Sequence, residues 1–443
     1  MPKPPVTKFA LDVPAFNSNP DKMTVFDTFR ERGFFQQATH PEELQTAASA
    51  GRLCAYIGFD PTASSLHVGH LIPLMGLAHL QRAGHRIVAL MGGGTAMIGD
   101  PSGKTEIRKM LSVAQLDENI QGLKPQMERF FDFSGDSLLL NNAEWLRTLN
   151  YIDFLRDIGR HFSVNRMLSF ETYKARLEHG LSFLEFNYQL LQAYDFLELN
   201  RRHDCVLQMG GDDQWANIIS GVDLIRRVEQ KPAFGWTYPL LTTASGKKMG
   251  KTEKGAVWLD PGRTSPYEYY QYWVNSEDAD VECFLALFTF LSMEEVRELG
   301  RLQGAEIREA KRRLAFETTR LAHGESEAVK AQQAAQTLFG GGGELQDVPT
   351  TVVSEAQLRE GIGLLDGFRM TGLCKSNGEV RRMLGQGGLY IHNEAANDPG
   401  MTFGFDDLRD GAILLRAGKK RFHRITLGEP HLSRFPKSSN SRL

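Results

Sequence analysis

Residues 53–70 read Leu-Cys-Ala-Tyr-Ile-Gly-Phe-Asp-Pro-Thr-Ala-Ser-Ser-Leu-His-Val-Gly-His, and the organisation of the first half of the chain follows from them. The apolar run at 53–59 predicts a buried parallel strand, and residues 71–81 predict the helix that follows it. A second apolar run, 86–91, predicts the next strand and ends in three glycines. Strand, helix and strand in this order indicate a parallel α/β sheet, in which the loops at the carboxyl ends of the strands face one crevice.

The polar turn between the first strand and its helix carries two histidines, His67 and His70, separated by Val68 and Gly69. Nucleotides commonly bind at such strand-to-helix junctions, because backbone N–H groups there point toward anionic phosphates. The turn therefore suggests that the chain handles a polyphosphate. Two histidines at this spacing also occur as a packed or a metal-binding pair, and the turn alone does not separate these interpretations.

Two later loops combine glycine with lysine. Residues 99–104, Gly-Asp-Pro-Ser-Gly-Lys, resemble a phosphate-binding P-loop but are one residue short of its spacing, so we reject a P-loop ATPase. Lys104 and Arg108 are still expected to approach phosphate, and Asp100 an amine. The loop at 245–252 holds three lysines between glycines and is suited to close over a polyphosphate. A solvated turn is the alternative for both loops.

A predominantly helical segment is expected at 141–200. Within it, Tyr188, Gln192 and Asp195 are spaced by four and three residues, so they project from one side of a helix. Polar groups on an otherwise apolar stripe either bond to partners in the core or line a pocket, because burying them unpaired costs about 1–3 kcal/mol. Taken without other context, packing in the core is the better supported of these two interpretations.

A further strand is predicted at 205–209, and it runs into Gly210, Gly211, Asp212 and Asp213. Paired glycines at a strand end let a ligand approach the backbone closely, and an acidic residue there is suited to bind ribose hydroxyls. The aspartates are equally suited to cap the helix that follows. A metal pair is disfavoured, because neighbouring residues on a strand point to opposite faces.

Length and composition limit the number of domains and the classes of protein to which the chain can belong. At 443 residues the chain is long enough for two or three domains. No apolar run reaches the roughly 18 residues that span a bilayer, and no secretion signal is present, so we expect a cytoplasmic protein. The 4 cysteines are scattered, which argues against a zinc knuckle or a disulfide framework. Residues 371–443 carry 12 Lys and Arg against 7 Asp and Glu, which suggests a polyanion-binding module or a merely solvated surface.

The pattern divides the chain into five parts. We expect a Rossmann-like catalytic domain at 1–245, a loop and connector at 246–265 and an α-helical domain at 266–339. Glycines then open a flexible linker at 340–354, which leads to a small α+β module at 355–443. Inside that module we predict a helix at 377–384 and strands at 389–392, 413–416 and 422–427.

The motifs and their order resemble the class I aminoacyl-tRNA synthetases, and most closely the bacterial type of tyrosyl-tRNA synthetase. His-Val-Gly-His at 67–70 is similar to the HIGH signature, and Lys-Met-Gly-Lys-Thr at 248–252 to the KMSKS loop, with Gly and Thr in place of its serines. More specific are Tyr-x-Gly-Phe-Asp-Pro-Thr at 56–62, the loop at 99–104 and Gly-Gly-Asp-Asp-Gln-Trp at 210–215. The resemblance covers nearly the whole chain, and the module after the linker resembles an S4-type RNA-binding domain.

The resemblance implies a role for each matching residue. Tyr56 and Asp195 would hold the phenol hydroxyl of tyrosine, and Gln214 would lie near its carboxylate. The residues matching the α-amino site are Asp100, Tyr188 and Gln192. The implied catalytic residues are Thr62, His67, His70, Lys104, Arg108, Lys248, Lys251 and Thr252. The implied ATP-binding residues are Gly58, Asp60, His67, Gly69, His70, Gly210, Gly211, Asp213, Lys248, Met249 and Lys251, and no metal held by protein ligands is implied.

The implied reaction is tyrosine activation by ATP, followed by transfer of the tyrosyl group to tRNA(Tyr). ATP is then a substrate that brings Mg²⁺ with it, and a homodimer is the implied assembly. The resemblance also implies that the helical domain at 266–339 binds the anticodon region of the tRNA, together with the S4-like module. Two departures from the family pattern stand near the nucleotide. Ile57 replaces a side chain that in some relatives is polar or a thiol, and Asp212 adds negative charge where the family often has a small neutral residue.

Two rival functions remain open at this point. A tryptophanyl-tRNA synthetase shares the fold and both signatures, but an indole only donates a hydrogen bond, whereas Tyr56 and Asp195 suit a group that both donates and accepts. An RNA-binding protein that has kept the scaffold without the activity is the other rival. Both histidines and the lysines of the loop at 248–252 argue against it.

Overall fold

The structure is a computed structural model of the chain, and the residues that it describes are given below. The chain divides into two compact units, Met1–Val329 and Lys330–Leu443, of which α15 (Glu325–Gly340) spans the boundary. The described residues are 24–102, 111–246, 249–252, 255–340, 348–392, 394–409, 411–418 and 421–427, with side chains left out at 251–252 and 337–340.

The first unit is built on a sheet that has six strands among the described residues. Its order is β1 (Gln37–Ala38), β6 (Phe234–Tyr238), β5 (Leu207–Gly211), β2 (Cys54–Phe59), β3 (Arg86–Met91) and β4 (Leu138–Asn141). All neighbouring strands are parallel except β1, which pairs antiparallel with β6. The predicted strands at 53–59 and 86–91 are confirmed, as is the helix between them, α3 (Leu71–Arg82).

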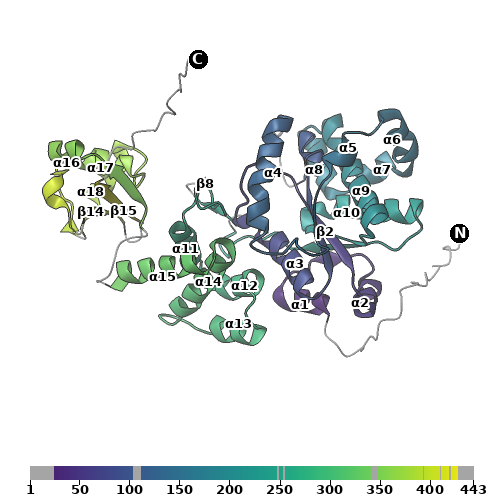
Figure 1. Ribbon diagram of the computed structural model, residues 1–443, viewed down its shortest axis with the longest axis horizontal. Helices are drawn as coiled ribbons and strands as arrows, with labels where there is room; N and C mark the ends of the chain where they lie inside the picture. The colour runs from purple at the N-terminus through teal and green to yellow at the C-terminus, as the bar shows by residue number, and fades with distance from the viewer. Residues whose placement is uncertain are drawn as a thin grey trace, which may run out of the picture. The chain divides into compact units, whose positions relative to one another are not determined.

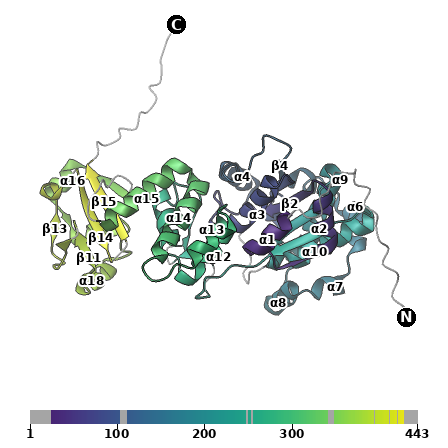
Figure 2. The ribbon, with the colours of Figure 1, turned by 90° about the horizontal axis from the view of Figure 1, so that it is seen from below.

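Helices cover both sides of this sheet (Figures 1 and 2). Alternate strand residues, among them Tyr56 and Val88, pack into one apolar core with α9 (Phe183–His203) and α10 (Trp215–Val228). The rings of Tyr56 and Phe196 lie 5.3 Å apart in that core. The other helices of the sheet region are α1 (Val25–Arg32), α2 (Pro41–Ala50), α4 (Val113–Met127), α5 (Ala143–Leu146), α6 (Tyr151–Asp157), α7 (Val164–Leu168) and α8 (Glu171–His179).

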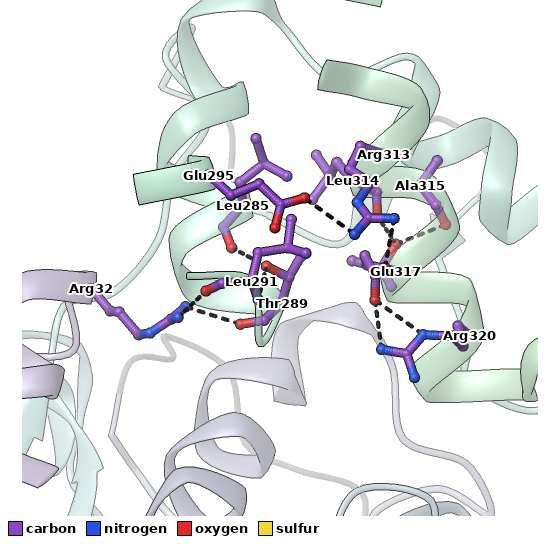
Figure 3. A network of polar contacts seen from close by, with 11 residues as sticks. Arg32, Leu285, Thr289, Leu291, Glu295, Arg313, Leu314, Ala315, Glu317 and Arg320 are labelled. Carbon is purple, nitrogen blue, oxygen red and sulfur yellow. Dashed lines mark hydrogen bonds and ion pairs between the residues drawn. The ribbon is translucent and has the colours of Figure 1, made fainter. Parts of the chain in front are cut away.

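An α-helical region completes the first unit and contains α11 (Pro266–Val274), α12 (Val281–Phe288), α13 (Met293–Gly300) and α14 (Ile307–His323). Arg32, at the end of α1, joins it to the sheet region (Figure 3). Its buried guanidinium donates to the carbonyls of Ala286, Thr289 and Leu291, with distances of 2.8 and 3.0 Å to the first two. Because carbonyls at the end of a helix lack intrahelical partners, the cation satisfies groups that would otherwise be buried unpaired.

His79 of α3 lies beside this junction, among the rings of Phe29, Phe34 and Phe290 at 6.4, 5.6 and 4.9 Å. Burial lowers the pKa of His79 to about 3, and the cations of Arg32 and Arg82 add to the effect. The folded protein therefore needs a neutral imidazole here. Since the unfolded pKa is about 6.5, the stability from this residue is complete above pH 6.5 and is lost as the pH falls toward 3.

His79→Leu is therefore expected to flatten the acid dependence of stability. Between pH 7 and pH 5 the free energy of unfolding should fall by about 2 kcal/mol more in the wild type than in the variant, since each pH unit below 6.5 costs about 1.4 kcal/mol. Chemical unfolding at the two pH values measures the difference. His179→Leu, which changes an exposed histidine, is the control and should keep the wild-type pH dependence. Equal slopes for all three proteins would contradict the prediction.

The second unit holds a sheet with the order β12 (Glu394–Ala395), β11 (Leu389–Ile391), β14 (Ala412–Ala417), β15 (Arg421–Leu427) and β9 (Thr350–Val353). The predicted linker at 340–354 is wrong at its carboxyl end, because β9 lies inside it and pairs parallel with β15. The predicted helix at 377–384 and the strands at 389–392, 413–416 and 422–427 are confirmed to within a residue at each end. The remaining elements are α16 (Glu355–Glu360), α17 (Leu364–Met370), α18 (Asn377–Gly385) and the paired strands β10 (Ile362–Gly363) and β13 (Thr402–Phe403).

This unit has an apolar core of its own. Leu364, Phe368, Val380, Leu389 and Ile413 are all fully buried in one cluster. The second unit is thus expected to fold on its own contacts. In the described part of the whole chain, no helix combines the length and the apolar character that a bilayer crossing requires.

Candidate active site

A pocket of about 560 Å³ opens in the first unit, beside the carboxyl ends of β2 and β5 and one side of α9. Most of the predicted site residues line it. They are Tyr56, Gly58, Asp60, Thr62, His67, His70, Asp100, Tyr188, Gln192, Asp195, Gly210, Gly211, Asp213 and Gln214.

The other predicted residues fall into two groups. Gly69 and Met249 are described but are not among the lining residues. Lys104, Arg108 and Lys248 lie outside the described residues, as do the side chains of Lys251 and Thr252, whose backbone forms the two-residue strand β7 (Lys251–Thr252) beside β8 (Gly255–Ala256). Their predicted roles in binding phosphate stay predictions.

Asp195 lines the pocket and is almost fully buried, with 2% of its surface exposed. Trp145 Nε1 donates to one carboxylate oxygen at 2.7 Å, and Asn142 Nδ2 donates to the other at 2.9 Å. Burial raises the pKa of Asp195 to about 8, against the lowering effect of these two hydrogen bonds, and Asp60 and Glu198 raise it further. The two donors fix the plane of the carboxyl group and leave it able to accept one more hydrogen bond.

Tyr56, on β2, lines the same part of the pocket and is buried. Among the described residues no group lies within hydrogen-bonding distance of its hydroxyl. Burial, with a contribution from Asp195, holds the pKa of Tyr56 well above its usual value, so the hydroxyl keeps its proton. A buried hydroxyl without a partner costs free energy, and a ligand oxygen that accepts from it would recover that cost.

Three further residues that line the pocket, Asp100, Tyr188 and Gln192, carry oxygen atoms that can accept hydrogen bonds. Asp100 accepts from the Ser102 backbone N–H at 2.9 Å and from Gln214 Nε2 at 2.7 Å. Gln192 Oε1 accepts from Asn217 Nδ2 at 3.1 Å. Each of these two acceptors is thus held in place by donors of the protein, and each lines the pocket.

The third acceptor, Tyr188, donates its hydroxyl proton to Asp60 at 3.0 Å. Asp60 accepts a second hydrogen bond from Thr95 Oγ1 at 2.8 Å, and Thr95 in turn accepts from Asn142 at 3.0 Å. Since Asn142 also bonds to Asp195, one continuous network of hydrogen bonds joins Asp195 to Tyr188. Asp60, predicted to bind ATP, therefore also orients Tyr188, which is predicted to bind the amino acid.

The histidine turn, residues 67–70, also contributes to the pocket through His67 and His70. His67 Nδ1 accepts from the Gly69 backbone N–H at 3.0 Å, and His70 Nδ1 accepts from the His67 backbone N–H at 3.2 Å. Because both Nδ1 atoms accept, both neutral rings carry their proton on Nε2. Residues 257–259 run beside this turn, with backbone bonds from Val68 to Val257 at 2.9 Å and from Leu259 to Leu66 at 2.9 Å.

Gly250, in the loop that resembles KMSKS, packs on the same turn. Its φ is +78°, in the left-handed region, and a Cβ built there would lie 3.0 Å from the backbone nitrogen of Gly69. Its N–H donates to the Tyr272 hydroxyl at 3.3 Å, and its carbonyl accepts from Val257 at 3.1 Å. A glycine suits this position, because only glycine adopts such a conformation without strain and leaves room for so close an approach.

Asp212 and Ile57, the two residues that depart from the family pattern, lie in different surroundings. Asp212 accepts from Gln37 Nε2 at 2.6 Å and from Thr237 Oγ1 at 3.1 Å, and it is not among the lining residues. Its charge is therefore turned away from the pocket. Ile57 does line the pocket and brings an apolar surface to it.

With this geometry described, comparison with known proteins identifies the family. The family model for tRNA synthetases class I (W and Y) matches residues 48–340. A tyrosine–tRNA ligase of Caldanaerobacter subterraneus subsp. tengcongensis is 57% identical over 408 residues, which cover 92% of this chain and 100% of the relative. That of Desulfatibacillum aliphaticivorans is 54% identical, with coverage of 92% and 100%. The chain belongs to the tyrosine–tRNA ligases.

Solved structures of tyrosyl-tRNA synthetases agree with this assignment. A C-terminally truncated mitochondrial tyrosyl-tRNA synthetase of Aspergillus nidulans has a TM-score of 0.64 and 31% identity, over 72% of this chain and 95% of its own. A tryptophanyl-tRNA synthetase of Encephalitozoon cuniculi has a TM-score of 0.51 at 13% identity, over 69% of this chain and 86% of its own, and shows a shared fold alone. As a tyrosine–tRNA ligase, the chain is a class I aminoacyl-tRNA synthetase, and the expected α/β fold with helical and small-sheet modules is confirmed.

Three residues that hold the site together were not predicted from the sequence of this ligase. Asn142 and Trp145 lie at and beside α5, in a segment without a motif. Asn217 lies two residues after the Gly-Gly-Asp-Asp-Gln-Trp motif. This proximity is the one feature of the sequence that could have indicated a role for Asn217. All three are nearly fully buried. Asn142 is itself a lining residue of the pocket, whereas Trp145 and Asn217 are not among the lining residues and contact them through hydrogen bonds.

Proposed function

We propose that the pocket binds L-tyrosine and ATP side by side and forms tyrosyl-adenylate with release of pyrophosphate. The tyrosyl group then passes to the terminal adenosine of tRNA(Tyr). The observation that carries the proposal is the pair of buried groups at the end of the pocket, the Asp195 carboxyl and the unpartnered Tyr56 hydroxyl. A phenol donates to the first and accepts from the second, whereas phenylalanine would leave both buried groups unpaired.

The α-amino group of tyrosine is proposed to bind Asp100, Tyr188 and Gln192. A protonated amine carries three N–H donors and no acceptor, and each of these residues offers it an oxygen. Gln214 donates to Asp100 at 2.7 Å and keeps a second N–H, which we assign to the tyrosine carboxylate. Both ends of the amino acid are then bound through groups whose orientation the protein fixes in advance.

Activation needs no covalent enzyme intermediate. The tyrosine carboxylate is ionised at pH 7 and attacks the α-phosphorus directly, so the residues of the site act by positioning and by stabilising charge. We assign Thr62, His67 and His70 to the ATP phosphates and ribose, and Asp213 with its preceding glycines to the ribose. We assign the lysines of the loops at 99–104 and 248–252 to pyrophosphate. Mg²⁺ enters with ATP, bound mainly by phosphate oxygens.

Amino-acid-dependent pyrophosphate exchange tests this function. The purified protein should exchange pyrophosphate into ATP with tyrosine and at background rate with tryptophan or phenylalanine. Exchange driven best by tryptophan would overturn the substrate assignment. Binding of tRNA without any exchange would instead show a synthetase scaffold that has lost its activity.

The second unit and the helical region are proposed to bind tRNA(Tyr), and the protein is proposed to work in the cytoplasm. Arg381 and Arg382 are exposed on α18, and Arg416 stacks on the Tyr390 ring at 3.6 Å on the sheet of the same unit. Cations beside aromatic rings are suited to bind phosphate and stacked bases. The excess of basic residues at 371–443 supports the same assignment.

A homodimer is the proposed assembly, and exposed apolar side chains in the segment from α6 to the start of α9 support it. Ile152 is 67% exposed and Phe183 70% exposed, and Tyr151, Val164 and Leu177 add further apolar surface. Large apolar side chains gathered in one segment at such exposure are typical of a surface that another protein covers. A second copy is the natural partner, since most soluble oligomers are symmetric homo-oligomers.

Phe183→Asp is therefore expected to convert the dimer into a monomer of 49.7 kDa. Burying a carboxylate in an apolar interface costs far more than the contact of one ring contributes. Sedimentation velocity measures the change. Val352→Asp, at an apolar residue that is 61% exposed in the second unit, is the matched control and should stay dimeric. A wild type that sediments as a monomer at micromolar concentration would contradict the proposed assembly.

A further inference from the structure

Asn217, near the start of α10, has 1% of its surface exposed and touches the pocket only through other side chains. Its Nδ2 donates to Gln192 Oε1 at 3.1 Å and to Gln214 Oε1 at 3.1 Å. No described group bonds to its own Oδ1, which is also buried. The side chain thus directs both of its N–H groups at two glutamines that line the pocket and that come from different elements.

These two bonds decide which way each glutamine amide faces. A side-chain amide has an oxygen that accepts and a nitrogen that donates, and a half turn exchanges them at little cost when nothing holds them. With Asn217 donating, the Oε1 atoms must face it. Gln214 then turns Nε2 toward Asp100, at 2.7 Å, and Gln192 keeps its oxygen, which has a second lone pair, as the acceptor at the pocket.

The orientation matters for a ligand that carries a protonated amine. If the amide of Gln192 turned around, its N–H groups would meet the N–H groups of the amine. If that of Gln214 turned around, its oxygen would face the carboxylate of Asp100 and remove a hydrogen bond that orients Asp100. Either change would convert an attraction for the ammonium group into a repulsion.

We propose that Asn217 is a positioning residue, which sets the orientation of Gln192 and Gln214 and thereby makes the pocket select ligands with a protonated α-amino group. The inference rests on the proposed function, in which this end of the pocket receives the amino group of tyrosine. A residue with a merely structural role would bond to the backbone, as the buried Asn200 does by donating to the Cys205 carbonyl at 2.9 Å.

Two ligands that differ only in the amine test the proposal on the full-length protein. Tyrosinol carries the phenol and the ammonium group, and 3-(4-hydroxyphenyl)propan-1-ol carries the phenol without the amine. Dissociation constants for both are measured by NMR titration. The wild type should prefer tyrosinol, and Asn217→Leu, which keeps the volume but has no donor, should bind tyrosinol about tenfold or more weakly. Affinity for the amine-free alcohol should stay within about twofold, which also shows that the variant is folded.

Asn200→Leu is the matched control, because it removes a buried asparagine of equal exposure that faces away from the pocket. It should keep the wild-type ratio of the two dissociation constants. Asn217→Ala provides a second variant in case the leucine is not accommodated, and it should show the same selective loss. An equal loss for both ligands in both Asn217 variants, or no loss for either, would overturn the inference. Failure of the wild type to bind either ligand would refute the proposed function instead.

Discussion

Asp195→Asn is expected to lower kcat/KM for tyrosine-dependent pyrophosphate exchange by about 100- to 10,000-fold. Two losses combine. The phenol loses a hydrogen bond to a charged acceptor, worth about 1.5–3 kcal/mol, and an amide nitrogen now faces a donor. Because Asn142 and Trp145 donate to both oxygens of Asp195, either orientation of the new amide sets one N–H group against another, at a cost of about 1–3 kcal/mol.

The assay is made at pH 8.5, since burial raises the pKa of Asp195 to about 8 and most of the wild-type carboxyl groups are ionised at this pH. Glu198→Gln is the control. It removes a charge one turn along the same helix, from a residue that pairs with Arg201 and Arg202 and does not line the pocket. Its exchange rate should stay within about threefold of the wild type. An Asp195→Asn protein that keeps most of its rate and its preference over phenylalanine would refute the role of the carboxylate.

Deleting residues 345–443 is expected to leave tyrosine-dependent exchange within about twofold of the wild type and to lower tRNA charging by about 100-fold or more. Every lining residue of the pocket belongs to the first unit, and the deleted part has its own core, so adenylate formation does not depend on it. The transfer step loses the basic surface that we assign to tRNA. Exchange and aminoacylation measured on one preparation separate the two effects.

A variant with smaller changes tests whether the positive charge of the second unit is responsible for the loss of tRNA charging. Arg381→Gln with Arg382→Gln keeps the second unit and neutralises two exposed cations of α18. It should weaken charging several-fold, with a smaller loss at low salt, because contacts between exposed charges are screened by added ions. Charging that survives the deletion unchanged would exclude a tRNA role for the second unit.

Sequence patterns predicted the elements that carry strong local signals. The strands β2 and β3 were predicted because continuous apolar runs bounded by glycine and proline are typical of buried parallel strands. β9 was missed because four residues next to a glycine-rich stretch carry little periodicity, and its strand character comes from pairing with β15, more than 70 positions later. The predicted strand at 205–209 was shifted, since β5 begins at Leu207 and extends through both glycines.

The same distinction applies to the site. Residues inside motifs, such as Tyr56, His67 and Asp213, were predicted and line one pocket. Asn142 and Trp145 were missed, because the direction in which a donor points depends on tertiary packing and leaves no pattern in the chain. The orientation of the Asp212 side chain could not be predicted from the sequence either, since its partners Gln37 and Thr237 come from two other strands.

Gly250 has a consequence for anyone who redesigns this loop after the general signature of the class. A design that copied the KMSKS signature would place serine at this position. In this chain the substitution would place a Cβ 3.0 Å from the backbone nitrogen of Gly69 on a residue with φ of +78°, a conformation that costs an L-amino acid about 1–2 kcal/mol. A residue taken from a general signature is thus not the best one in every member, and serine here would disturb the histidine turn.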